Sequence, residues 1–170
     1  ASAELLGAIG VIATLVYLAR QIMHNSDQLR GSATTAVFEY QRSLAAMLLD
    51  NPDLYKIALR GNEDWDSLDT FEQQQFSIWC LHDTGMWEMS HRLFEQGALD
   101  EHLYRGKEAY WLQTHSSPGR REWWNNHSFM LSQYFHQAIS KKLLEIPVEK
   151  LRKSNPVFDS SVHEARDQSL

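Results

Sequence analysis

The feature that most constrains this chain is an uncharged apolar stretch near its N-terminus. Residues 5–19 contain no charged side chain, and Thr14 is their only clearly polar residue. A helix formed by this stretch is apolar on every side, so it needs a protein core or lipid around it. A membrane span takes roughly 20 apolar residues, and this run has 15. We interpret it as a membrane-anchoring helix, with a helix buried in the protein or against a partner as the alternative.

The residues that flank the stretch indicate how it would lie in a bilayer. Arg20 directly follows the run and can extend its guanidinium to the headgroups, while Tyr17 falls where aromatic belts occur. Basic residues, here Arg20 and Arg30, favour the cytoplasmic side of a membrane. A cleaved signal peptide fits less well, because no basic segment precedes the run. We therefore expect a single-pass helix with the following domain in the cytoplasm.

Small residues recur along the same stretch. Gly7 lies four residues after Ala3, and Thr14 lies four residues after Gly10. Such spacing lets the backbones of two membrane helices approach closely. We expect Gly7, Gly10, Thr14, Tyr17 and Arg20 to contact lipid or the helices of partner subunits, and a homo-oligomer formed by these helices is an alternative.

Helical periodicity extends through the rest of the chain, and no strand-like alternation persists. Apolar spacing predicts one long helix to about residue 50, followed by helices over residues 52–60, 70–96, 101–115, from 118 to about 125, and from 128 or 132 to 144. The predicted fold is all-α: a long N-terminal transmembrane helix that continues into an irregular bundle of about five shorter helices. We divide the chain into an anchor (1–23), a helical domain (24–145) and a polar tail (146–170).

Residues 70–96 are expected to form the central helix of the domain. A helical wheel places Phe71, Ile78, Trp79, His82, Met86, Met89 and Leu93 on its apolar face, and Ser77, Thr84, Glu88, His91 and Glu95 on its polar side. Trp123 and Trp124, on a later helix, are candidates for contact with a membrane interface or a partner, although core packing of at least one ring is the simpler interpretation.

Composition excludes several classes of function. The net charge of −6, without a basic stripe, argues against general affinity for nucleic acid. A single cysteine, Cys80, excludes an internal disulfide and a cysteine-based zinc site. We expect no cofactor.

Three groups of residues carry a resemblance to a known family. Tyr17-Leu18-Ala19-Arg20-Gln21-Ile22 closes the apolar stretch, Gln96-Gly97-Ala98-Leu99-Asp100 follows the central helix, and Ser117-Pro118-Gly119-Arg120 precedes Trp123-Trp124. Their order resembles a group of uncharacterised bacterial proteins that have a single N-terminal membrane helix and a small helical domain. The resemblance implies the bacterial inner membrane as the location and transfers no activity.

Two pairs are candidates for chemistry. His82 and Asp83 are predicted on or beside the apolar face, where a buried acid needs a partner and can mark a functional site. Glu88 and His91 have the Glu-x-x-His spacing that supplies two metal ligands in di-iron bundles, but the chain holds no second copy. The sequence therefore favours a non-catalytic, membrane-anchored accessory subunit of a larger membrane complex. A small enzyme or ligand-binding sensor that uses His82 and Asp83 is the alternative, as is a homo-oligomeric membrane scaffold.

Overall fold

The computed structural model describes the backbone of residues 2–146 and the side chains of residues 7 and 10–146. This part of the chain is helical and contains no strand. The six α-helices are α1 (Ser2–Leu49), α2 (Pro52–Glu63), α3 (Thr70–Glu95), α4 (Glu101–Thr114), α5 (Pro118–His127) and α6 (Gln133–Leu144), with single 3₁₀ turns at Trp65–Ser67 and Ser128–Met130. The all-α prediction is thus confirmed, whereas the predicted tail lies outside the described residues from 147 onward.

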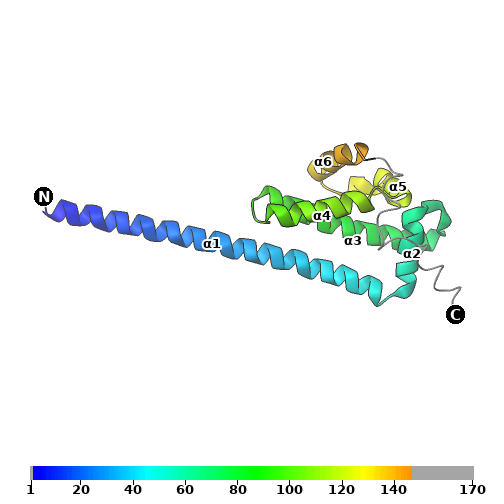
Figure 1. Cartoon of the computed structure of the whole chain (residues 1–170), viewed down its shortest axis with the longest axis horizontal. Coiled ribbons are helices and arrows are strands. Elements are labelled where there is room, and N and C mark those ends of the chain that lie inside the picture. Colours follow the sequence, from blue (N-terminus) through cyan, green and yellow to red (C-terminus); the bar gives the residue numbers. More distant parts are fainter. Residues whose placement is uncertain (1, 147–170) are drawn as a thin grey trace.

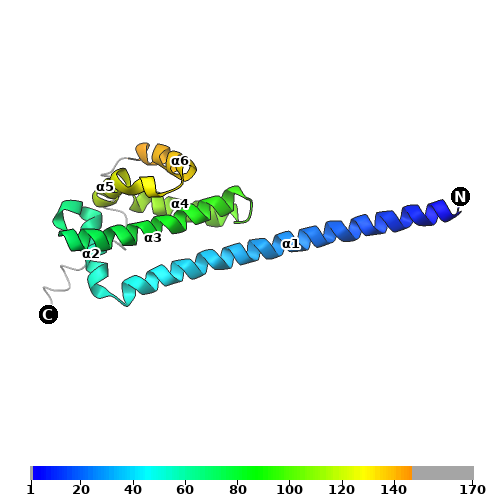
Figure 2. The same cartoon turned by 180° about the vertical axis from the view of Figure 1, so that it is seen from behind.

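Helix α1 dominates the shape of the molecule. It is one uninterrupted helix of 48 residues, as predicted, and at 1.5 Å per residue it is about 72 Å long. Its C-terminal part lies alongside the helical domain, whereas its N-terminal part extends well beyond every other helix (Figures 1 and 2). The two parts meet near Arg30, whose Nε donates a hydrogen bond to the Gly97 carbonyl at 3.2 Å.

The length of α1 does not by itself make this helix a membrane span. Within the part of the chain that the structure describes, no helix is both long enough and apolar enough to cross a membrane. The side chains of residues 5, 6, 8 and 9, which belong to the apolar stretch, lie outside that description.

Local signals place the helix ends in the domain. Asn51 caps α2 through a bond from the Leu54 amide, and Pro52 occupies the first turn. Asp69 and Glu72 form a capping box at the start of α3, in which each side chain accepts a hydrogen bond from the other residue's backbone amide. Gly97, the single residue with positive φ among those described, ends α3 at φ 68°. Residues within one turn of each helix end thus specify where α2 begins and where α3 begins and ends.

The end of α2 differs from the prediction. The sequence predicts that this helix ends at residue 60, directly before Gly61 and Asn62, but it continues to Glu63. A Cβ atom on Gly119 would lie 1.7 Å from the Gly61 carbonyl oxygen. The two glycines therefore let the backbones of α2 and α5 approach closely, and Gly61 serves packing rather than helix termination.

The predicted faces of α3 are also partly wrong. Phe71, Ile78 and His82 are exposed, while Thr84 and His91, expected on the polar side, are buried. Trp79 and Met86 are buried as expected. The wheel fails because polar residues of α3 find partners inside the bundle, so polarity does not mark its solvent side.

The core is aromatic and centred on Trp87, which has no exposed surface. Its ring stacks on that of Trp111, with centroids 5.8 Å apart, and meets Phe135 edge-on at 5.5 Å. Trp123 and Trp124 belong to the same core and are 0% and 3% exposed. The prediction that these two tryptophans contact a membrane or partner is therefore wrong for this structure; their indole nitrogens donate inward, to Ser77 and Ser140.

Candidate functional site

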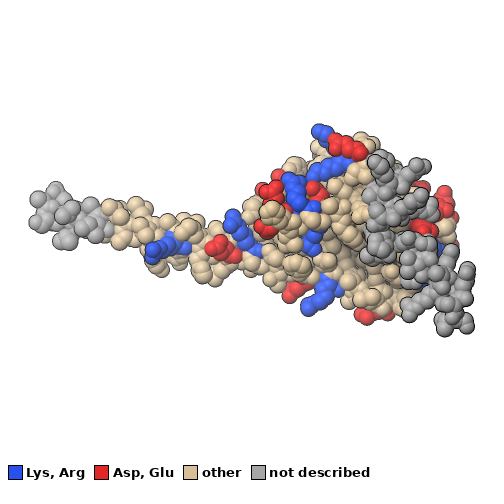
Figure 3. Space-filling model, in the orientation of Figure 1, with Lys and Arg blue, Asp and Glu red and all other residues tan. Residues whose placement is uncertain are grey.

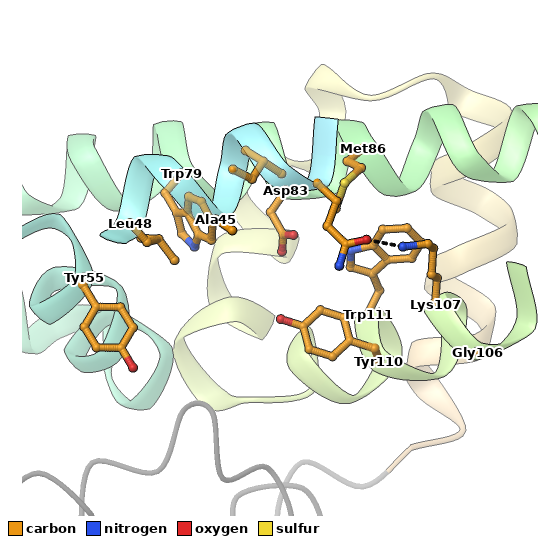
Figure 4. Close-up of a pocket in the computed structure, with 12 residues that line it drawn as sticks. Ala45, Leu48, Tyr55, Trp79, Asp83, Met86, Gly106, Lys107, Tyr110 and Trp111 are labelled. Carbon is orange, nitrogen blue, oxygen red and sulfur yellow. Dashed lines mark hydrogen bonds between the residues drawn. The ribbon is translucent and has the colours of Figure 1, made fainter. Parts of the chain in front are cut away.

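A cavity of about 330 Å³ opens between α1, α2, α3 and α4. Figure 4 shows that α1 and α3 form one side of it and α4 the opposite side. Most of its walls are apolar or aromatic, and its polar side-chain groups are few: a carboxylate, an ammonium, an amide, two phenols and two indole N–H groups. The lining residues are Gln41, Leu44, Ala45, Leu48, Tyr55, Trp79, Asp83, Met86, Gly106, Lys107, Tyr110 and Trp111.

Asp83 is the charged group in the interior of this cavity. Its side chain is 7% exposed and accepts a 2.8 Å hydrogen bond from Nη1 of Arg120, whose side chain is fully buried. Arg120 Nε also donates to Asn62 Oδ1 at 2.9 Å. Each charge is offset by the other, which is the condition under which a protein interior tolerates them. Asp83, Arg120 and Asn62 are called the buried ion-pair cluster below.

The cluster depends on how α5 begins. Pro118 occupies the first turn of α5, and Gly119 lets that turn approach the backbone of α2. Arg120 is thereby carried into the core beside Asn62 of α2 and Asp83 of α3. The Ser-Pro-Gly-Arg motif thus links α5 to α2 and α3 through the side chain of Arg120.

The mouth of the cavity carries Lys107. Its ammonium donates a hydrogen bond to Gln41 Oε1 and lies 4.9 Å from the centre of the Phe38 ring. Burial lowers the pKa of this lysine. Nearby, burial and the negative charge of Asp83 raise the pKa of the Tyr110 phenol.

Two indole N–H groups of the lining lack an acceptor in the protein. Trp79 is 5% exposed and Trp111 is 1% exposed, and neither Nε1 has a hydrogen-bond partner. A buried donor left without an acceptor costs about 1–3 kcal/mol. Two unsatisfied donors thus belong to residues that line the cavity.

The structure separates the first predicted pair. Asp83 faces the cavity, but His82 is exposed and its backbone carbonyl accepts a hydrogen bond from the Tyr40 hydroxyl at 3.2 Å. The prediction that His82 lies on the buried face is wrong, because the buried arc of α3 passes through Asp83 and Trp79 instead. The partner of Asp83 is Arg120, which lies 37 residues away in the sequence.

Glu88 and His91 also have separate partners. The Glu88 carboxylate accepts a bond from the Ser132 amide at 3.0 Å, whereas Nδ1 of buried His91 lies 2.7 Å from the Tyr104 hydroxyl. Tyr104 donates in turn to Glu108, which also binds Lys142. Among the described residues, no group of three or more histidine, cysteine or acidic side chains is placed to hold a metal ion.

The residues predicted to contact lipid or a partner lie far from the cavity. Gly7, Gly10, Thr14, Tyr17 and Arg20 are all exposed on the projecting part of α1. The Thr14 hydroxyl donates to the Gly10 carbonyl at 2.9 Å, within the helix. No side chain of another element lies within 4 Å of the Cβ positions of Gly7 and Gly10.

The cavity lining holds few groups that could act as nucleophiles. Its described lining includes no serine, threonine or cysteine, and the charge of Asp83 is offset by Arg120. Cys80 is fully buried outside the lining, and burial raises the pKa of its thiol to about 12. The sequence analysis did not identify Lys107, Tyr110 and Trp111 as cavity residues, nor Arg120 as the partner of Asp83. Comparison with family models, curated proteins and solved structures found no match for this chain.

Proposed function

We propose that this protein is a non-catalytic subunit that α1 anchors in a membrane, where it serves a larger membrane complex. The observation that supports the proposal is the exposure of the projecting part of α1. Apolar side chains there are turned to solvent on all sides of the helix; Val11 and Ile12, for example, are 60% and 61% exposed. The others are Leu15, Val16, Tyr17, Leu18, Ile22 and Met23.

Such a surface needs a covering of matching chemistry. An exposed apolar patch of this kind marks contact with a membrane or a protein, and a helix that is apolar all round fits lipid better than a one-sided protein groove. Figure 3 shows no charged side chain on α1 between its grey tip and the first blue patch. Arg20 would then lie at the headgroups, with the domain on the cytoplasmic side.

The test is flotation of the full-length chain with phospholipid vesicles. Ile12→Glu combined with Val16→Glu places two charges in the apolar part and should abolish co-flotation, because a charge within a bilayer costs several kcal/mol. Leu49→Glu is the matched control: Leu49 is 80% exposed on the same helix but lies beside the domain. Flotation of the double variant, or no flotation of the unchanged chain, would refute the anchor.

The proposal that α1 meets partner helices has its own test. Replacing Gly7 and Gly10 with leucine covers the small-residue face but leaves the helix apolar. This variant should float with vesicles as the unchanged chain does, while losing the membrane proteins that co-purify in mild detergent. Retention of the same proteins would count against a contact at this face.

A further inference from the structure

The cavity between α1, α2, α3 and α4 has a definite shape and chemistry that the anchoring role does not use. Its volume of about 330 Å³ is at the small end of ligand sites, which span roughly 300–1,000 Å³. Leu44 and Leu48 of α1 and Trp79 and Met86 of α3 belong to its lining, and in Figure 4 Tyr110 and Trp111 of α4 lie on the opposite side. A slender apolar chain fits such walls, whereas a lipid with two chains would need more room.

The charges of the lining residues indicate which charge a ligand would carry. Asp83 is the one carboxylate of the described lining, and the buried Arg120 guanidinium offsets its charge at 2.8 Å. Lys107 is the lining's one ammonium, and its hydrogen-bond partner there, Gln41, is a neutral amide. The uncompensated charge of the lining is therefore positive and lies at the mouth.

A hydrogen-bond donor accompanies that charge. Trp111 follows Lys107 by one turn on α4, so both side chains emerge from the same face of that helix. Both side chains line the cavity, and Figure 4 draws the hydrogen bond of Lys107 as a dashed line. The N–H of Trp111 is buried and has no acceptor in the protein. An ammonium and an unpartnered N–H at one end of an apolar cavity complement an anionic oxygen group.

We propose that this cavity binds a medium-chain aliphatic carboxylate. The carboxylate lies between the Lys107 ammonium and the Trp111 N–H, and the chain runs between Leu44, Leu48 and Met86. The ligand class goes beyond the anchoring role and does not depend on it, because every group involved belongs to the domain or to the part of α1 that packs on it.

The experiment compares three probes with the same alkyl chain and different head groups: decanoate, decanol and decyltrimethylammonium. The full-length chain, kept in solution with amphipol, carries 5-fluorotryptophan, and ¹⁹F NMR follows each indole. Decanoate should shift the Trp111 resonance saturably and bind roughly tenfold more tightly than decanol, since a charge-assisted contact is worth about that factor. The cationic probe should bind more weakly than decanol.

Three variants distinguish binding in the cavity from nonspecific association of the alkyl probes with other apolar surfaces. Lys107→Met should reduce decanoate affinity to the level of decanol, whereas Lys141→Met, which removes an exposed lysine of α6, should change nothing. Ala45→Phe fills the cavity from the exposed side of α1 and should abolish saturable shifts with every probe. The Trp123 resonance is the internal control, because that indole is buried outside the lining and its N–H donates to Ser77.

Three results would overturn the proposal. They are equal affinity for decanoate and decanol, tighter binding of the cationic probe, and saturable shifts that persist in the Ala45→Phe variant. The substituted positions 45 and 107 are not among the buried core residues, so the variants should fold; far-UV circular dichroism checks this.

Discussion

Replacing Gly119 with alanine tests the close approach of α2 and α5. The added Cβ would lie 1.7 Å from the Gly61 carbonyl oxygen, 2.9 Å from its carbonyl carbon and 3.2 Å from the Trp65 amide nitrogen. Ordinary contact begins near 3.4 Å, so the α2 backbone must retreat by about 1.7 Å. All three obstructing atoms are backbone atoms, so no side-chain rotation relieves the clash.

The cost follows from two consequences of that movement. Overpacking of a core typically costs about 1–3 kcal/mol. The shift also displaces Asn62, the residue after Gly61, from its 2.9 Å hydrogen bond with Arg120; a bond to a charged group contributes about 1.5–3 kcal/mol. We expect Gly119→Ala to lower the free energy of unfolding by about 3–5 kcal/mol. For a chain of this size the melting temperature would fall by about 6–20 °C.

Urea denaturation followed by circular dichroism measures the effect, and two glycine variants calibrate it. Gly61→Ala should cost less, about 1–3 kcal/mol, because its Cβ meets the side chains of Phe76 and Leu68 rather than backbone. Gly85→Ala, whose nearest neighbour is the Tyr40 hydroxyl at 3.7 Å, should stabilise α3 by about 0.5–1 kcal/mol. A loss below 1 kcal/mol for Gly119→Ala, or a larger loss for Gly61→Ala, would refute the reasoning.

Two further predictions concern buried polar groups. Arg120→Met leaves Asp83 buried without its partner and should cost about 3–5 kcal/mol, of which Asp83→Leu in the same chain should restore a part; additive losses in urea denaturation would contradict the coupling. Burial and the positive charge of Arg120 hold the pKa of His115 well below its usual range, so the unfolded chain binds a proton that the folded chain does not, and stability should fall as the pH drops below about 6.5. His115→Gln should flatten that dependence between pH 7 and 5, and an unchanged slope would show that His115 is not its source.

Much of the helical framework could be predicted from the sequence because helix ends are local. Asp69 and Glu72 lie three residues apart, and Pro52 directly follows Asn51, so each cap is complete within one turn. Gly61 gave a false signal, since a glycine near a helix end marks a stop in one context and close packing in another. The residue that distinguishes the two contexts is Gly119, on another helix.

The buried faces were harder to predict, because polarity in this bundle is a poor guide to exposure. Thr84 and His115 are both buried, and they satisfy each other through a 2.8 Å hydrogen bond between Oγ1 and Nε2. Neither residue shows in isolation that it has a partner 31 positions away. Phe71 and Ile78, in contrast, are apolar and yet 67% and 57% exposed. The helical wheel of residues 70–96 assigns Thr84, Phe71 and Ile78 to the wrong side, because it weighs each residue without its tertiary partner.

The charged groups of the cavity could be predicted only in part from the sequence. Asp83 could be identified as an acid beside an apolar arc that needed a partner, and the structure supplies that partner in Arg120. The sequence contains several other arginines, and only the approach of α5 to α2 brings this one to Asp83. Because Arg120 offsets the charge of Asp83, Lys107 decides the charge that the cavity presents. The charge expected of the proposed ligand therefore depends on a contact between the backbones of Gly61 and Gly119, which do not themselves line the cavity.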